Sequence, residues 1–347
     1  SAMALVDAHI PKPDRALRRR AVRLALDSAV AAGLTGVHDA GVSSDDLSLY
    51  RDLADDEALP LRIYAMADGD AAALAQLCRD GPYQHAKGRL SMRAVKLYAD
   101  GALGSRGAAL LADYDDDAGN RGLLIQSPAQ LNKLIARAAD CRIQPAVHAI
   151  GDRANRAVLD AFAALSAQQR AQLRPRIEHA QVVAPEDISR FAQLGVIASM
   201  QPTHATSDMP WAQARIGAQR LRGAYAWRRF MDQGVHIALG SDFPVERVQP
   251  LLGVYAAVTR QDAKGEPKGG WLPDQKLTLM ETLDGFTRGA AYAGFAESSV
   301  GTLEVGKKAD FVELSIDPRR LRGRGLLSID VHSTWVDGRK VWPQKRQ

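Results

Sequence analysis

The chain has few of the features that mark membrane, secreted or disulfide-rich proteins. No hydrophobic run approaches the roughly 18 apolar residues that a membrane helix requires, and the first residues lack the apolar stretch of a signal peptide. The chain has only two cysteines, which exclude a disulfide scaffold and suit a reducing compartment. We therefore expect a cytoplasmic protein that does not bind membranes.

The chain also lacks a strong excess of charge of one sign. The formal net charge is +5 over 347 residues, and the excess basic residues lie in 318–347, so the rest of the chain is close to neutral. Binding to nucleic acid requires a basic face, which this distribution does not provide. The charge distribution therefore argues against a nucleic-acid partner and leaves the function open. Its hydrophobic content of 46% is enough for one large core and a smaller one.

Short apolar runs alternate with segments of helical periodicity along most of the chain. The predicted strands are 36–39, 61–65, 94–99, 144–149, 176–179, 196–201 and 236–242. The segments between them carry helix start signals, such as Ser127 followed by Pro128. Strands that alternate with helices in this way predict a parallel sheet with right-handed crossovers.

The fold that this alternation favours is an α/β TIM-type barrel, (β/α)8, with seven of its eight βα units visible over residues 1–300. A doubly wound open sheet is the rival, but it predicts a glycine-rich phosphate loop, and neither G-x-G-x-x-G nor G-x-x-x-x-G-K-[ST] occurs. Residues 301–347 begin with turn-forming residues and then carry two predicted strands, 309–314 and 331–341. We interpret them as part of a small β-sandwich.

Polar residues lie at four of the predicted strands, namely Lys96, His148, His179 and Asp242. In a βα barrel, the catalytic groups lie where the strands end, at one face. Two imidazoles and a carboxylate are ligand types of a catalytic zinc ion, which keeps a position open for water. A single histidine at a strand end is more often structural, so the predicted metal site depends on the convergence of these residues.

Lys96 lies between apolar neighbours in its strand and is expected to point into the barrel. A buried lysine is costly unless it is paired or neutralised. Three interpretations remain open: an ion pair, a carbamate formed with CO2 that bridges metal ions, and a Schiff-base nucleophile. The presence of two histidines and an aspartate favours the carbamate.

Further polar residues near the strand ends are candidates for contact with a substrate. They are His38, Asp100, Arg106, Asp152, Arg153, Gln201 and His204. Loops at strand ends often carry binding residues, although most charged loop residues are simply solvated.

Four stretches, 95–106, 147–154, 177–181 and 239–242, together resemble the amidohydrolase superfamily. The resemblance is greatest to the N-substituted formamide deformylase-like branch, also called the amidohydrolase-3 group, and it extends over essentially the whole chain. It implies a barrel hydrolase with one or two divalent metal ions, zinc as a rule. Such enzymes cleave an amide or a related non-peptide C–N bond, for example in N-acyl or N-formyl compounds, with a metal-activated water.

The resemblance also implies a role for each strand-end residue. Lys96 matches the carboxylated lysine that bridges the two metals, and His148 and His179 match ligands of the second metal. Asp242 matches the catalytic aspartate that binds the first metal and transfers the proton. The family's first barrel strand ends in His-x-His, and this sequence contains no His-x-His.

The chain therefore resembles a family member without its N-terminal part, which carries that strand and half of the β-sandwich. We expect at most one metal ion here, low activity, and exposed sheet edges that favour a homodimer. Two alternatives stay open. One is a catalytically impaired fragment or a regulatory pseudoenzyme, and the other is a Schiff-base lyase that uses Lys96.

Overall fold

A seven-stranded parallel sheet forms the centre of the molecule. The computed structural model describes residues 6, 9–69 and 71–343. The parallel strands are β1 (Gly36–Val42), β2 (Arg62–Asp68), β4 (Leu90–Tyr98), β5 (Gln144–Ala149), β6 (Arg176–His179), β7 (Ile197–Met200) and β8 (Ile237–Leu239). They are hydrogen-bonded in the order in which they occur along the chain. This order confirms all seven predicted strands and the barrel class, and a short β3 (Tyr83–Gln84) adds one antiparallel pair beside β4.

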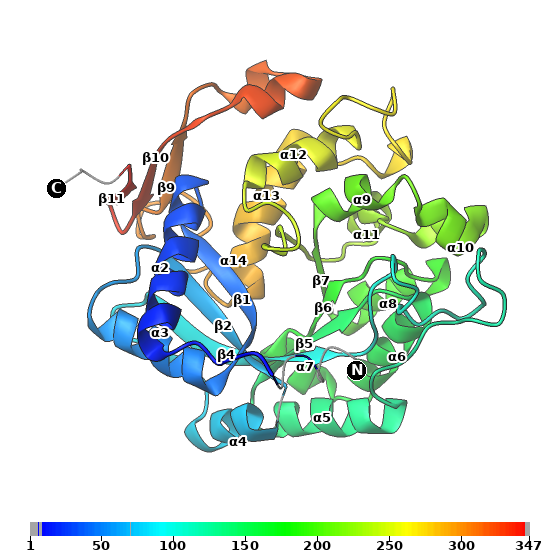
Figure 1. Ribbon diagram of the computed structural model, residues 1–347, viewed down its shortest axis with the longest axis horizontal. Coiled ribbons are helices and arrows are strands. Elements are labelled where there is room, and N and C mark those ends of the chain that lie inside the picture. The colour runs from blue at the N-terminus through cyan, green and yellow to red at the C-terminus, as the bar shows by residue number, and fades with distance from the viewer. Residues whose placement is uncertain (1–5, 7–8, 70, 344–347) are drawn as a thin grey trace.

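Helices connect these strands, and most of them lie around the outside of the curled sheet (Figure 1). They are α2 (Arg15–Ala31), α3 (Ser44–Asp55), α4 (Ala71–Asp80), α5 (Pro128–Asp140), α6 (Asp152–Ala163), α7 (Ala167–Leu173), α8 (Pro185–Leu194), α9 (Pro202–Asp208), α10 (Ala212–Arg220), α11 (Trp227–Asp232), α12 (Pro250–Thr259), α13 (Leu279–Asp284) and α14 (Ala290–Ala293). The predicted start at Ser127 is confirmed, because its side chain forms a capping box with Gln130.

Side chains alternate between the two faces of the strands with a period of two, so the outer face is apolar, whereas the inner face carries both small apolar clusters and buried charged residues. Val95, Val147 and Ile177 are fully buried in the main core. The neighbouring residues Lys96 and Glu178 are buried as well, at 6% exposure each, although both are charged. The inner face of the sheet therefore carries the buried charged side chains that are candidates for a functional site.

A three-stranded antiparallel sheet follows the barrel, made of β9 (Phe311–Leu314), β10 (Val331–Val336) and β11 (Arg339–Trp342) in the order β11-β10-β9. It confirms the predicted strands after residue 301, the second of which is divided into β10 and β11 by a turn at Asp337 and Gly338. Arg62 of β2 donates to the carboxylates of Asp310 and Asp337, so the small sheet is attached to the barrel by ion pairs. The division into two domains at residue 300 stays a prediction.

The two cysteines are joined by a disulfide, so the expectation of two reduced thiols is wrong for this structure. Cys78 lies in α4, and Cys141 caps the C-terminal end of α5. The Cα atoms of Cys78 and Cys141 lie 4.9 Å apart, within the range that a disulfide spans. In the described part of the chain, no helix is long and apolar enough to cross a membrane.

Candidate metal centre

The carboxyl ends of four neighbouring strands bring together three histidines and an aspartate. His148 is the penultimate residue of β5, and His179 is the last residue of β6. His204 lies in the first turn of α9, directly after β7, and Asp242 follows the end of β8. Parallel neighbours end at the same rim, so these side chains converge although they are far apart in sequence.

His179, His204 and Asp242 come close enough to share a ligand. Each offers one donor atom, and these atoms all lie within 4.8 Å of one another. His204 Nε2 is 3.7 Å from Asp242 Oδ2. The structure therefore brings together the predicted residues His179 and Asp242, and it adds His204, which the sequence suggested only as a substrate contact.

His148 lies against this group. Its ring centroid is 4.7 Å from that of His179, and the rings of His179 and His204 are 5.7 Å apart. His148 Nε2 lies 3.4 Å from Asp100 Oδ1, too long for a strong hydrogen bond. Three imidazoles thus pack together at one end of the sheet.

The donor atoms fit a divalent metal ion. His204 Nε2 is buried and has no hydrogen-bond partner among the described residues, and the same is true of His148 Nε2. A buried polar atom without a partner is costly, whereas a metal ion would satisfy an imidazole nitrogen. Two imidazoles and a carboxylate are a ligand set that zinc accepts while one position stays open.

The imidazoles are held in the form that binds metal. Burial lowers the pKa of His179 well below its ordinary value, and the charges of His148 and Lys96 lower it further. Burial also lowers the pKa of His204 to about 4. Both rings are therefore neutral at pH 7, and a neutral imidazole offers a lone pair to a metal ion.

Asp242 has a carboxyl group with increased proton affinity. Burial raises its pKa, Lys96 opposes this shift, and the charge of Glu178 adds to it. The backbone at Asp242 has φ of 59°, and at His179 φ is 77°, both in the left-handed region. Such conformations are costly for residues other than glycine and tend to occur at functional sites.

Lys96 lies on the inner face near this group, as the sequence predicted. Burial lowers its pKa, and the carboxylates of Glu178 and Asp242 oppose the shift. Its Nζ lies 4.7 Å from the ring centroid of Tyr98. Lys96 therefore has carboxylates near it and an aromatic ring beside it.

Sequence reasoning missed Glu178 and Arg176, which form a buried ion pair on the inner face. The Arg176 guanidinium donates to both carboxylate oxygens of Glu178, at 2.6 and 3.0 Å, and also to Ser199 Oγ. Burial raises the pKa of Glu178, but Arg176 and Lys96 outweigh it and hold the pKa below its ordinary value. The signal was present, because both residues precede His179 at alternating strand positions.

His38 is bound to this ion pair. Arg176 Nη1 lies 2.9 Å from His38 Nδ1, and burial lowers the pKa of His38 to about 3. His38 is therefore neutral and accepts a hydrogen bond. Its predicted contact with a substrate stays a prediction.

Several other candidates hold loops in place. Asp100 accepts hydrogen bonds from the backbone N–H groups of Ala109, Ile150 and Gly151. Asp152 likewise accepts from Leu111 and Arg153. These carboxylates order the segments after β4 and β5, so each has a structural role whether or not it also contacts a substrate.

Arg106 and Gln201 have clear partners as well. Arg106 pairs with Asp116 at 3.0 Å in an exposed loop. Gln201 is buried, and its Oε1 lies 2.8 Å from His179 Nδ1. Arg153, by contrast, has a buried Nε without a hydrogen-bond partner among the described residues. The substrate contacts of all three remain predictions.

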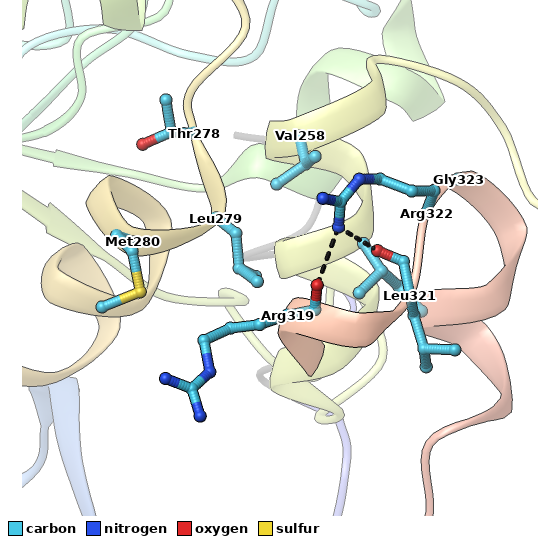
Figure 2. A pocket seen from close by; sticks show the side chains of 9 residues that line it. Val258, Thr278, Leu279, Met280, Arg319, Leu321, Arg322 and Gly323 are labelled. Carbon is cyan, nitrogen blue, oxygen red and sulfur yellow. Dashed lines mark hydrogen bonds between the residues drawn. The ribbon is translucent and has the colours of Figure 1, made fainter. Parts of the chain in front are cut away.

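The structure has a small cavity beside this site and a larger one away from it. A cavity of about 10 Å³ adjoins it and is lined by His179, Gln181, Met200, Gln201, His204, Tyr225 and Trp227. A larger one, of about 350 Å³, lies between α12, α13 and the turns near residue 320 (Figure 2). The larger hollow is mainly apolar, and the Arg322 guanidinium at its edge donates to the carbonyls of Arg319 and Leu321. It contains none of the strand-end residues.

A curled parallel βα sheet with imidazoles and a carboxylate at its carboxyl edge is typical of metal-dependent barrel enzymes. Comparison with known proteins specifies the class further. The chain belongs to the amidohydrolase family, whose sequence pattern matches residues 1–342.

Relatives with known names agree with this membership. YtcJ of Bacillus subtilis, which its name assigns to the amidohydrolases, is 32% identical over 93% of this chain and 61% of its own length. N-substituted formamide deformylase of Arthrobacter pascens is 29% identical over 90% of this chain and 58% of its own length. The chain thus spans about 60% of the length of these relatives.

A solved structure confirms the fold. An uncharacterized metal-dependent hydrolase from Pyrococcus horikoshii superimposes with a TM-score of 0.79 at 30% identity, over 88% of this chain and 60% of that one. The resemblance to the amidohydrolase superfamily and the barrel class are both confirmed.

Proposed function

We propose that this chain carries the metal centre of an amidohydrolase that cleaves an amide or related non-peptide C–N bond in an N-acyl or N-formyl small molecule. The convergence of His179, His204 and Asp242 carries the proposal. The substrate class is supported by the similarity to N-substituted formamide deformylase. We further propose zinc as the metal, because neutral imidazoles and one carboxylate suit it.

The roles of the residues follow from their environments. A divalent ion at this site supplies a Lewis acid that lowers the pKa of water and polarises a carbonyl group. His179 and His204 offer neutral imidazoles, which are fixed in place by burial. Asp242 takes a proton from the attacking water and gives it to the leaving nitrogen, and the raised pKa of its carboxyl group suits this transfer.

We propose that Lys96 is the carboxylated lysine of the family, formed when its amine adds to CO2 and releases a proton. The inward position beside the histidine cluster supports this assignment. The Schiff-base alternative predicts that borohydride traps a substrate on Lys96 and that chelators have no effect. The carbamate predicts neither result.

The test is release of amine from a panel of N-formyl and N-acyl amines by protein that was stripped with a chelator and then supplied with zinc. We expect hydrolysis only with the metal, and loss of hydrolysis in Asp242→Asn. Glu246→Gln is the matched control, because Glu246 is a nearby carboxylate that bonds Ser207 outside the cluster. Equal hydrolysis by the Asp242→Asn variant would contradict the proposal.

A non-catalytic role is the second candidate. A relative named exoenzymes regulatory protein AepA is 35% identical over 31% of this chain, which supports a regulatory pseudoenzyme. This candidate predicts that zinc binds and that no compound in the panel is cleaved.

We also propose a homodimer, because β1 and β8 end the sheet in the described part of the chain and, while α14 packs against β8, the edge of β1 can pair. Light scattering on the purified chain tests the proposal, because a homodimer has twice the 37.5 kDa mass of one chain. The cytoplasmic location stays a prediction, and the Cys78–Cys141 disulfide weakens the argument from reduced thiols on which it was based.

A further inference from the structure

The side-chain amide of Gln201 is fixed at both of its polar atoms. Gln201 follows the last residue of β7 and is buried, at 9% exposure. Its Nε2 donates to the backbone carbonyl of Ser199 at 3.3 Å, and its Oε1 faces His179 Nδ1 at 2.8 Å. A carbonyl oxygen can only accept, so the amide nitrogen must lie on the Ser199 side and the amide oxygen must face His179.

This orientation decides which nitrogen of His179 carries the hydrogen. Because Gln201 Oε1 is an acceptor, His179 Nδ1 must be the donor. In a neutral imidazole, the other nitrogen then holds the lone pair. Nε2 of His179 is thus the atom that can bind a metal ion, and the hydrogen bond determines the tautomer.

We propose that Gln201 is a positioning residue of the metal centre, which holds His179 in the Nδ1–H tautomer and leaves the Nε2 lone pair for the divalent ion. This inference rests on the proposed function of the site. Histidine ligands commonly donate their second N–H to an outer partner that orients the ring, and loss of that partner weakens metal binding. The role differs from the substrate contact that the sequence suggested for Gln201.

The surroundings leave His179 few other partners. Its ring is 7% exposed and packs between those of His148 and His204. The cavity beside it, about 10 Å³ in volume, has room for about one water molecule. Gln201 lines that same cavity, so a shorter or apolar side chain there leaves Nδ1 without its fixed acceptor.

The first test reads the tautomer in the metal-free protein. Nitrogen-15 NMR of the histidine rings is expected to show hydrogen on Nδ1 of His179 in the parent protein, and loss of that preference in Gln201→Leu. Gln181→Leu is the matched control, because Gln181 lines the same cavity but bonds Asp208 and Tyr225. Hydrogen on Nε2 in the parent protein, or an unchanged tautomer in Gln201→Leu, would overturn the proposal.

The second test measures zinc affinity by competition with a chelator. We expect Gln201→Leu to weaken binding by about 10- to 100-fold, Gln201→Glu to recover most of the loss because a carboxylate oxygen can accept from Nδ1, and Gln181→Leu to bind normally. Equal weakening in Gln201→Leu and Gln201→Glu would overturn the role assigned to Gln201.

The two measurements separate this inference from the proposed function. A parent protein that binds no zinc contradicts both the metal centre and the role of Gln201 in it. Normal zinc binding with an unaffected Gln201→Leu variant contradicts the role of Gln201 alone. The tautomer is measured without metal, so it can be read in either case.

Discussion

At the residue scale, burial controls the chemistry of the strand-end side chains. His179 and His204 stay neutral because the protein interior disfavours their charged forms, and Asp242 gains proton affinity for the same reason. Burial lowers the pKa of Lys96 and raises the pKa of Asp242, and the charge of each residue opposes the shift of the other. The packing of the His179 and His204 rings, whose centroids are 5.7 Å apart, depends on this neutrality, because two charged imidazoles at this distance would repel.

Asp208 is a second carboxyl group whose pKa is shifted by burial. It lies one turn after His204 and accepts hydrogen bonds from Gln181 and Tyr225, both at 2.6 Å. Burial raises the pKa of Asp208 from 3.8 to about 6, although these two hydrogen bonds oppose the shift. The folded state therefore prefers the protonated carboxyl, and this preference stabilises the protein at low pH and is lost as the pH rises through 6.

Replacing Asp208 with Asn removes this pH dependence. The shift from 3.8 to about 6 corresponds to a destabilisation of at most about 3 kcal/mol above pH 7. We expect Asp208→Asn to be more stable than the parent protein at pH 8, with the difference vanishing toward pH 4. Urea unfolding across this range is the measurement, and a variant that is less stable than the parent at pH 8 would refute this interpretation.

The sequence identified candidate residues at the strand ends but not their contacts. Lys96, His148, His179 and Asp242 could be found because each lies at a strand and is chemically unusual there. His204 was harder to rank, because its role depends on how the first turn of α9 projects over the rim. The Arg176–Glu178 pair was missed although its alternating positions were visible, because a charged pair within one strand is usually exposed and only the fold shows that this one is buried.

At the element scale, Arg62 connects the barrel to the small sheet. Its guanidinium binds Asp310 through two hydrogen bonds, at 2.7 and 2.9 Å, and also binds Asp337 at 2.6 Å. The Asp310 side chain is only 4% exposed, so removal of Arg62 would leave its carboxylate buried without that ion pair. The contact therefore holds β2 against the loops that flank β9 and β10.

Replacing Arg62 with Met should destabilise the fold strongly. Removing one partner of a buried ion pair leaves an uncompensated charge and costs about 3–5 kcal/mol. The control is Arg319→Met, because the Arg319–Asp317 pair is exposed and such pairs contribute at most about 1 kcal/mol. Urea unfolding of both variants measures the loss in the free energy of unfolding. A similar small loss in the two variants would show that Arg62 does not anchor the small sheet.

The Cys78–Cys141 disulfide connects two neighbouring outer helices, α4 and α5. It closes a segment with a sequence separation of 63 residues. A chain-entropy model predicts a stabilisation of about 4 kcal/mol for a loop of this length. We expect the double variant Cys78→Ala/Cys141→Ala to unfold at lower urea concentration, and a reductant to lower the stability of the parent protein but not that of the variant.

Thiol titration of the unfolded, unreduced protein is the control for this prediction. It should detect no free thiol. Two free thiols, or equal stability of the parent and the double variant, would show that the two helices are held together without a covalent link.

The strands were predicted more accurately than the later helices, for a physical reason. Seven apolar runs bounded by turn residues are a local signal, and each matches a strand. Residues 278–293 have helical periodicity, but they form α13, a π-helical turn (Gly285–Gly289) and α14 rather than one helix. Gly285 packs against Leu239, and Gly289 against the carbonyl of Ile237, so close approach to β8 determines the turn rather than local periodicity.

At the scale of the whole molecule, the order of the strands places the site. Each parallel strand is followed by a helix on the outer face, so the loops and helix starts after β5, β6, β7 and β8 meet at one edge (Figure 1). Pairing of consecutive strands gave this arrangement from sequence alone. The disulfide and the ion pairs to the small sheet could not be predicted, because they join segments far apart in the chain.

Both the sequence match to the amidohydrolase family and the similarity to a solved structure agree with this arrangement of strands. The sequence pattern covers residues 1–342, and the solved structure from Pyrococcus horikoshii shares the fold. The chain spans about 60% of the length of that structure and of the curated relatives described above. The candidate ligands His179, His204 and Asp242 all lie within this chain, so metal binding can be measured on it directly.

Zinc content per chain is the most direct test of the central claim. The protein is stripped with a chelator, supplied with zinc, freed of excess metal and measured by elemental analysis. We predict about one zinc ion per chain, with loss of the ion in His204→Ala and in Asp242→Ala. His236→Ala is the control, because His236 stacks on Tyr292 at 4.3 Å outside the cluster. Folded protein that retains no zinc, or His204→Ala and Asp242→Ala variants that retain as much as the parent, would contradict the account.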